Sequence, residues 1–375
     1  MRRVYFDNAS TTNVNPEVLA GYEKLLETCY VNSESLYDEG SQVHRMLEKA
    51  RSAIAGLFDV QPEEIIFTGG SSESNSMAIK GVPLADPKRK HIITTPIEHS
   101  SILNSCLQME RLFGYRITWL PVYPDGTVHA EDVKQALDDD TILVSVMMAN
   151  NETGAVNPIA EIADLVKHQS HAYMHVDMTQ AIGKVPCPMT NIDLASISAH
   201  KIEGLKGSGI LIRRRHVNME PLISGGEQEL GLRGGTSNAC ADMMLAKTLR
   251  LALEHEKEYT PYVQQLHDHL WQGLSAMEGV ELNSPEHGIP ETVNFSCEQI
   301  PSEVMQNALN EAGFMVSARS TCESKSNNPS YVLKAMGMSD RRASCCIRIS
   351  LSYHNTEAET DAFLNALKEI IRHYG

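Results

Sequence analysis

A lysine and an aspartate, each at the end of a β-rich run, are the residues best placed to do chemistry in this chain. Lys201 follows the run 196–200 and precedes the glycine-containing stretch 203–209. A lysine amine held there can form a Schiff base with a bound aldehyde. Asp177 ends the run 172–176, and ligands bind at the carboxyl ends of strands in open α/β sheets. Its carboxylate could pair with a protonated pyridine nitrogen. Taken singly, a surface lysine and an aspartate that caps a turn explain the two residues equally well.

A third signal precedes them in the chain. Residues 68–74 read Thr-Gly-Gly-Ser-Ser-Glu-Ser and are predicted to leave a strand and open a helix. Backbone N–H groups and small hydroxyls then converge at the positive end of a helix, where phosphate binds well. No Gly-Lys-Ser/Thr follows, so this is not a Walker loop, and a plain helix cap is the alternative. Chance does not readily place all three signals in this order within one α/β region.

Cys322 is the candidate nucleophile. It lies in the polar stretch 317–330, which has no periodicity and contains turn formers, so we expect an exposed loop. A cysteine in such a loop can form a thiolate and move, although an incidental loop thiol would look the same. The other cysteines fall within or beside apolar stretches and are interpreted as core residues: Cys29, Cys106, Cys187, Cys240, Cys297, Cys345 and Cys346.

The elements that must position these groups alternate between strand and helix in the first two-thirds of the chain. The predicted strands are 64–68, 91–95, 116–120, 142–149, 172–177, 193–199 and 209–213. A helix is predicted to begin at Asn15-Pro16, and further helices are predicted at 38–58, 72–81, 100–113, 130–137 and 159–168. Several strands are apolar on both faces, which is typical of a largely parallel sheet covered by helices.

The last third has a different texture. A long helical connector is predicted over 238–277, followed by strands 292–297 and 347–351, a helix at 302–312 and a last helix. This pattern predicts a smaller α+β domain. The fold class is therefore α/β, with a large, mainly parallel-sheet domain at 13–257 and a small domain formed by 1–12 and 258–375 that carries the Cys322 loop.

Composition limits the function classes. The formal net charge is −16, which argues against direct binding of nucleic acid through a broad basic surface. No signal peptide is predicted, and the longest apolar run, 141–149, is too short to span a membrane. The eight cysteines form no Cys-x-x-Cys pair, so neither a metal site nor a disulfide framework is predicted, and a reducing cytoplasm is expected.

Eight blocks make the pattern specific. In chain order they are 5–12, 68–75, 98–99, 150–154, 175–180, 198–201, 233–236 and 348–351. Through them the chain resembles the cysteine desulfurases, pyridoxal-phosphate enzymes of the class V aminotransferase family, over nearly its whole length. The resemblance implies aminotransferase fold type I, pyridoxal 5′-phosphate as cofactor and L-cysteine as substrate. The products would be L-alanine and a persulfide on Cys322.

The resemblance also implies roles for single residues. Lys201 would carry the cofactor and remove the substrate's α-proton, while His99 would stack on the ring and help move protons. Asp177 and Gln180 would bind the ring nitrogen and oxygen, and Asn151 and Arg348 would hold the amino acid. The phosphate would be held by Ser71, Ser72, Ser198 and His200, and by Thr236 of the neighbouring subunit, so a homodimer is implied.

Several positions depart from the family's pattern. Arg319 and Thr321 precede Cys322 where the family commonly has Gly-Ser-Ala, and Ser33-Glu34 replace a Pro-Ser pair. Glu203 stands where tyrosine or histidine is frequent. None of these removes a catalytic group, but they leave rate and substrate preference open.

The sulfur acceptor is left open as well. It is either a tRNA-thiolating enzyme or an iron–sulfur scaffold protein. Longer relatives carry a C-terminal tail that docks the scaffold, and this chain ends soon after its last predicted helix, which favours another acceptor. Two rivals to the desulfurase remain: another pyridoxal-phosphate lyase or transaminase, such as a selenocysteine lyase, and a non-catalytic scaffold for sulfur transfer.

Overall fold

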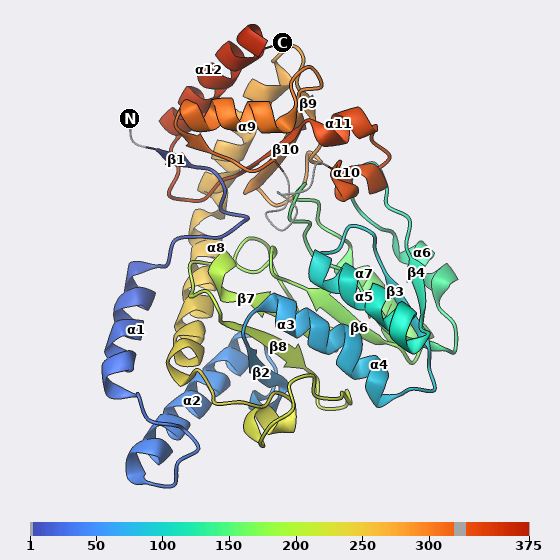
Figure 1. Ribbon diagram of the computed structural model, residues 1–375, viewed down its shortest axis with the longest axis vertical. Coiled ribbons are helices and arrows are strands. Elements are labelled where there is room, and N and C mark those ends of the chain that lie inside the picture. Colours follow the sequence, from blue (N-terminus) through green and yellow to red (C-terminus); the bar gives the residue numbers. More distant parts are fainter. Residues whose placement is uncertain (1–2, 319–327, 375) are drawn as a thin grey trace.

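A seven-stranded sheet organises the larger part of the molecule (Figure 1). The computed structural model describes residues 3–318 and 328–374. The spatial order of the strands is β2-β8-β7-β6-β5-β3-β4. Their bounds are β2 Ile65–Thr68, β3 His91–Thr94, β4 Arg116–Trp119, β5 Thr141–Ser145, β6 Tyr173–Asp177, β7 Leu194–Ser198 and β8 Gly209–Arg213. Every strand predicted for this region is present, which confirms the prediction of a large α/β unit.

The sheet is largely parallel, as predicted. Strands β4, β3, β5, β6 and β7 pair in parallel, and only β8 runs antiparallel to both of its neighbours, β7 and β2. Strand β2 therefore points the same way as β7, and its carboxyl end lies at the same edge of the sheet. Strands β5 and β7 are buried along their whole length, as strands covered on both faces must be.

The helices of this unit lie close to their predicted positions. They are α1 Pro16–Thr28, α2 Asp38–Leu57, α3 Ser71–Ser76, α4 Val82–Ala85, α5 Ser100–Phe113, α6 Ala130–Ala136 and α7 Ile159–Gln169. Asn15 caps α1 by accepting a hydrogen bond from the N–H of Glu17, with Pro16 in the first turn. Short 3₁₀ turns occur at Pro62–Glu64, Ala199–Lys201 and Gln228–Gly231.

Two predicted elements were wrong in part. The strand predicted over 142–149 ends at Ser145, although the N–H of Met148 still donates to the carbonyl oxygen of Asp177 at 3.0 Å, and Ala149 pairs with Val156. The single helix predicted over 72–81 is interrupted by a π-helical stretch, Met77–Gly81, between α3 and α4. Pro83 follows directly and has no N–H to donate to the residue four positions earlier, so regular α-helical bonding fails there.

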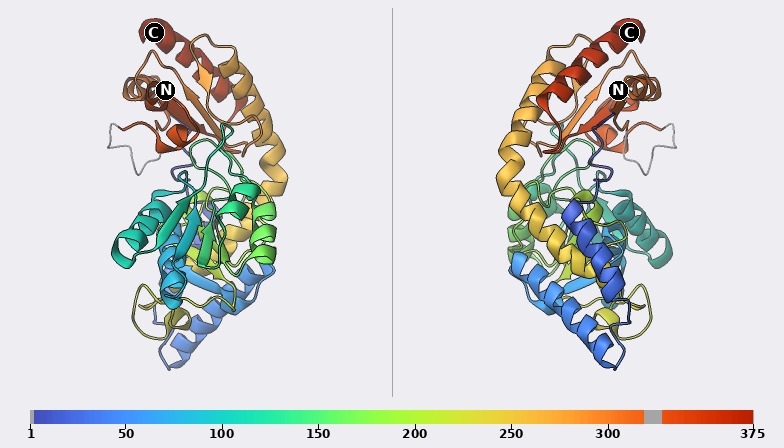
Figure 2. Two further views of the ribbon diagram at one scale, coloured as in Figure 1. Left: turned by 90° about the vertical axis from the view of Figure 1, so that its right-hand side faces the viewer. Right: turned by 90° about the vertical axis from the view of Figure 1, so that its left-hand side faces the viewer.

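A smaller unit carries its own sheets and core. Strands β9 Glu281–Leu282, β10 Thr292–Ser296 and β12 Cys346–Ser350 form an antiparallel sheet, and β1 Val4–Tyr5 pairs with β11 Phe314–Met315. Helices α9 Ser302–Glu311, α10 Tyr331–Ala335, α11 Asp340–Ser344 and α12 Glu357–Tyr374 belong to this unit. Both chain ends lie in it (Figure 2).

One long helix joins the two units. Helix α8, Ala239–Ser275, runs along both of them (Figure 2). Leu245 and Leu249 in its first half pack into the core of the large unit, whereas Leu266 and Leu270 in its second half pack into the core of the small unit. The N-terminal segment starts in the small unit and crosses to the large one. This segment and helix α8 therefore both connect the two units.

The cysteine predictions can be compared with burial. Six of the seven cysteines interpreted as core residues are buried, whereas Cys187 is only half-buried, because it lies in a surface loop at the edge of the core. Cys322 lies outside the described residues. In the described parts of the chain, no helix is long and apolar enough to cross a membrane.

Candidate active site

The predicted site residues meet at the carboxyl edge of the large sheet. Thr68, Gly209 and Ser198 stand side by side across β2, β8 and β7, and Asp177 ends the next strand, β6. The chain leaves each of β2, β6 and β7 at this edge. Residues 71–72, 177–180 and 198–201 are therefore brought together although they are far apart in sequence.

Asp177 is a buried carboxylate bound by neutral donors. Its side chain is 4% exposed. Asn75 Nδ2 donates to Asp177 Oδ2 at 2.7 Å, and the N–H of Thr179 donates to Oδ1 at 2.9 Å. Within the described residues these contacts supply no cation, and a buried carboxylate without one is costly. A protonated ring nitrogen would supply that charge.

His99 stands at the start of α5. Its Nδ1 accepts from the N–H of Ser101 at 3.2 Å and lies 2.8 Å from Ser101 Oγ. Burial lowers the pKa of His99, and the positive charge of Lys201 acts in the same direction, although Asp177 opposes it. The imidazole is therefore held in its neutral form near neutral pH.

The four residues predicted to hold phosphate line one pocket: Ser71, Ser72, Ser198 and His200. A Cβ on Gly209 would lie 2.6 Å from the Cα of Gly70, so this glycine allows the start of α3 to approach the sheet. Lys206 also lines the pocket and adds a cation that was not predicted. Burial, with the nearby cations Lys201 and Lys206, lowers the pKa of His200 to about 4. An anion bound in this pocket would meet hydroxyl groups, a neutral imidazole and one ammonium group.

Lys201 lies on the 3₁₀ turn after β7. Its Nζ donates to the carbonyl oxygens of Ala9 at 2.7 Å and Ser10 at 2.6 Å, so the amine faces the N-terminal segment. Gln180 binds the same segment, donating to the Ala9 carbonyl at 2.9 Å and accepting from Lys184 at 2.8 Å. In this arrangement the amide of Gln180 is bound to protein groups at both ends.

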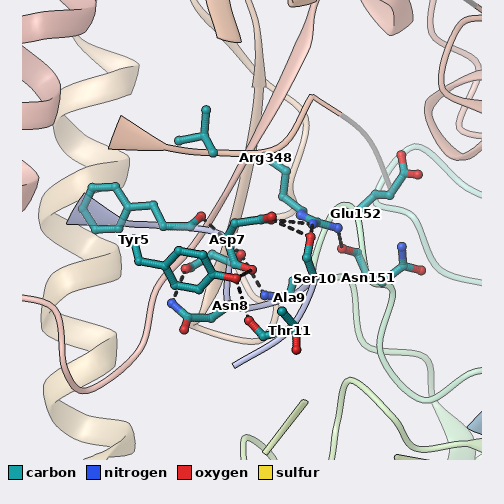
Figure 3. A network of polar contacts seen from close by, with 12 residues as sticks. Tyr5, Asp7, Asn8, Ala9, Ser10, Thr11, Asn151, Glu152 and Arg348 are labelled. Carbon is teal, nitrogen blue, oxygen red and sulfur yellow. Dashed lines mark hydrogen bonds and ion pairs between the residues drawn. The ribbon is translucent and has the colours of Figure 1, made fainter. Parts of the chain in front are cut away.

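Arg348 is the centre of a polar network between the two units (Figure 3). Its guanidinium is 1% exposed. Nη1 donates to the carbonyl oxygen of Asn151 at 2.8 Å, while Nη2 donates to Asp7 Oδ1 and Ser10 Oγ, both at 2.9 Å. Among the described residues, the buried atoms Arg348 Nε and Asn151 Oδ1 have no hydrogen-bond partner. One donor and one acceptor thus remain available to an amino acid substrate.

Two predicted residues are not part of this cluster as described. Thr236 lies in an exposed loop before α8. Cys322 lies outside the described residues, but both flanks of its segment are anchored at the site. Ser317 exchanges backbone hydrogen bonds with Arg348, at 2.7 and 3.2 Å. On the other flank, Ser330 Oγ donates to Glu152 Oε2 at 2.6 Å.

Sequence reasoning missed several residues of the network. Asp7 and Glu98 were noted only as parts of matching blocks, and Asn75 received no role. Burial, with a smaller effect of the Asp177 charge, raises the pKa of Glu98 to about 8. Spacing alone does not find such residues, because Asn75 and Asp177 are 102 positions apart. An uncharged polar residue at a helix position facing the sheet was the available signal.

The features of this site fit pyridoxal phosphate. Asp177 has neutral partners where a ring nitrogen would bind, the pocket at Ser71 suits a phosphate, and Lys201 lies on the turn that follows β7, the strand beside Asp177. Each feature is a property of this chain's own residues.

Comparison with known proteins gives consistent matches. The Aminotransferase class-V family model matches residues 4–363. The chain is 40% identical to "Cysteine desulfurase 2" of Trichormus variabilis, covering 99% of this chain and 94% of that protein. It is 39% identical to "Cysteine desulfurase IscS" of Clostridium botulinum, covering 99% and 95%.

Solved structures agree with these relatives. A structure named "NIFS-LIKE PROTEIN" superposes with a TM-score of 0.92 at 36% identity, covering 99% of this chain and all of that one. A structure described as "SspA in complex with cysteine" has a TM-score of 0.81 at 32% identity, covering 94% and 99%.

Proposed function

The chain belongs to the class-V aminotransferase family, and on that premise we propose that it is a cysteine desulfurase that uses pyridoxal 5′-phosphate. L-cysteine and the thiol of Cys322 react to give L-alanine and a Cys322 persulfide. The C–S bond of the substrate breaks and an S–S bond forms, so no external oxidant is needed. The observation that carries the proposal is the buried carboxylate of Asp177. It lies at the end of β6, the strand next to the one that leads to Lys201, and its described donors are neutral.

The large unit provides the cofactor site. Pyridoxal phosphate, when bound, supplies an acceptor for the electrons of the substrate's α-carbon. Asp177 would keep the ring nitrogen protonated, Gln180 would bind the ring oxygen and His99 would lie against the ring. Ser71, Ser72, Ser198 and His200 would bind the phosphate in the pocket that they share, and Lys201 would hold the aldehyde. The amine of Lys201 would also be the base that takes the proton from the α-carbon of L-cysteine.

Substrate binding falls to the network between the two units. Arg348 binds the carboxylate of L-cysteine, with its unpartnered Nε–H as one donor, and Asn151 contributes its unpartnered amide oxygen. The carboxylate competes with Asp7 for Nη2 of Arg348. A substrate that lacks a carboxylate would leave the Arg348 Nε–H unsatisfied in a buried position.

The anchored flanks support a role for Cys322 as sulfur acceptor. Ala318, whose carbonyl oxygen accepts from Cys346 Sγ, precedes Cys322 by four positions. Four extended residues span about 14 Å at most, so Cys322 stays near the anchor beside Arg348. That reach suits a thiol that takes sulfur at the site and then carries it outward.

The division of the chain is proposed at 13–257 for the cofactor domain and at 1–12 with 258–375 for the small domain. The separate hydrophobic cores support it, since Phe6 packs with residues 263–370 in the core of the small unit. The boundary near residue 257 then falls inside α8, which makes this helix a rigid connector.

A homodimer is proposed as the working form. Thr236 is exposed and does not line the Ser71 pocket of its own chain, which suits a residue that binds the partner's phosphate. Large exposed apolar side chains support this arrangement: Tyr30 at 83%, Leu36 at 99% and Leu230 at 56%. The persulfide then passes to a protein acceptor, a tRNA-thiolating enzyme or an iron–sulfur scaffold, in the cytoplasm.

The test starts from the colour of the purified protein. We expect a yellow protein whose colour is lost with borohydride, and which releases L-alanine and sulfide from L-cysteine and a reductant. Cys322→Ala should keep the colour and lose sulfide release. Colour with an equal rate in Cys322→Ala would point to another lyase, such as a selenocysteine lyase. A colourless protein that still binds acceptor proteins would point to a scaffold.

A further inference from the structure

A chain of hydrogen bonds connects Asp177 to His99 through two residues that have no assigned role. Asn75, on α3, is fully buried, and its Nδ2 donates both to Asp177 Oδ2 at 2.7 Å and to Ser101 Oγ at 3.0 Å. Ser101, on α5, lies 2.8 Å from His99 Nδ1 through its hydroxyl. The group expected to bind the ring nitrogen and the group expected to stack on the ring are thus joined by Asn75 and Ser101.

The direction of each bond can be worked out. A carboxylate only accepts, so the amide nitrogen of Asn75 must face Asp177. The backbone N–H of Ser101 only donates, and it donates to His99 Nδ1 at 3.2 Å. Nδ1 therefore carries a lone pair, and the neutral imidazole holds its proton on Nε2. Since Ser101 Oγ accepts from Asn75, its own hydrogen is available to donate to the same Nδ1.

We propose that Asn75 and Ser101 are positioning residues that orient the Asp177 carboxylate and fix His99 as its Nε2–H tautomer. This inference rests on the proposed function and deepens it. A neutral His99 of this kind presents a hydrogen-bond donor at Nε2 and cannot accept a proton at that atom. Removal of the α-proton therefore falls to Lys201, while His99 donates.

Asn75 is the more consequential of the two. Without it Asp177 keeps only the N–H of Thr179 among the donors described, so one oxygen of a buried carboxylate is left without its donor. A carboxylate that is no longer held in place binds a ring nitrogen less well. Loss of Asn75 should therefore weaken cofactor binding, in addition to any effect on rate.

The test uses ¹⁵N-histidine NMR on the purified protein, with His99→Gln to assign the signals of His99. Wild type should show His99 protonated on Nε2 and bare on Nδ1. Ser101→Ala should keep that tautomer, because the backbone donor remains, but should raise the pKa of His99 by about half to one unit. Ser76→Ala is the matched control, since this neighbour of Asn75 contacts Ser105 and lies outside the chain of bonds.

Cofactor affinity gives the second measurement. Asn75→Leu should raise the Kd for pyridoxal phosphate about 10- to 100-fold, the effect of losing a bond to a charged group. Asn75→Asp, which keeps the size and removes the donor, should change the Kd in the same direction and covers the case in which the leucine variant does not fold. Ser76→Ala should leave the Kd unchanged.

A proton on Nδ1 of His99 in wild type would overturn the proposal. So would a change in the Kd for pyridoxal phosphate in Asn75→Leu and Asn75→Asp that is no larger than the change in Ser76→Ala. The NMR result does not depend on turnover. If the protein never becomes yellow with pyridoxal phosphate, the proposed function fails, while the tautomer of His99 can still be read.

Discussion

The two sides of the site are held in different ways. On the large-sheet side, Asn75 makes a buried bond to Asp177 and is joined to His99 through Ser101, within a single unit. On the other side, Arg348 binds Asn151, and Glu203 binds Tyr353 and His354, across the boundary between the units, and part of that seam is exposed to solvent. The first side is rigid and does chemistry, whereas the second depends on how the two units meet. Substitutions on the two sides should therefore fail differently.

The largest effect is expected on the rigid side. Lys201→Ala removes both the amine that holds the cofactor and the base, so formation of L-alanine from L-cysteine should fall by at least about 10⁴-fold. The unfolding midpoint in urea should change little, because the described bonds of the amine go to backbone carbonyls, those of Ala9 and Ser10. A variant that retains a tenth of the wild-type rate would contradict the role of Lys201.

Asp177→Asn comes next. The amide keeps the shape of the side chain but cannot hold a ring nitrogen in its protonated form, so kcat should fall about 10²- to 10³-fold. The absorption spectrum of the bound cofactor should change with it. Asp193→Asn serves as a control, since Asp193 is a buried acid just before β7 whose partners are Met174 and His216, away from the site. Equal losses of kcat in the two variants would mean that the effect is structural.

On the seam, Arg348→Lys should act on binding and leave most of kcat. Lysine keeps the charge but loses the fork that donates to Asn151 and Asp7, so the KM for L-cysteine should rise about 10- to 100-fold. Asp7→Asn provides the opposite change, because it removes the competitor of the substrate carboxylate. The KM should then fall, and a rise in the KM of Asp7→Asn would argue against competition at Arg348.

The same contrast explains what could be predicted from sequence. Apolar runs and helix caps are local, so the start of α1 at Pro16 and the strands of the large sheet, apart from the end of β5, were found within about two residues. Strand ends also predicted that residues near Asp177 and Lys201 would meet. The bonds of Asn75 and Asp7 could not be predicted, because they join positions 102 and 341 residues apart that only the packed fold brings together. The π-helical stretch at 77–81 was missed for another reason, since Pro83 acts on the preceding turn and its effect was not weighed.

Glu203 offers the smallest effect and the finest test of the seam. This residue has a left-handed backbone conformation, with φ of 62°, two positions after Lys201. Its Oε1 lies 2.6 Å from His354 Nε2, and its Oε2 accepts from Tyr353 Oη at 2.7 Å, so it connects the Lys201 turn to the small unit. The bond from Glu203 raises the pKa of His354, although partial burial opposes it. Burial acts to raise the pKa of Glu203, but the bonds from His354 and Tyr353 outweigh it and lower that pKa.

These shifts set a pH window. Stabilisation by a histidine with a raised pKa is complete below its ordinary value of 6.5 and disappears as the pH rises through the raised pKa. The glutamate's share is complete above its ordinary value of 4.5 and disappears as the pH falls through the lowered pKa. Glu203→Gln should therefore lower the free energy of unfolding in urea most between these values, and less at alkaline pH. Because the His354 side chain is 62% exposed, solvent screening limits the difference to about 1 kcal/mol or less. If the loss of unfolding free energy in Glu203→Gln does not shrink as His354 loses its proton, Glu203 acts through Tyr353 and the backbone. The contact between the two units would then not depend on the charge of His354.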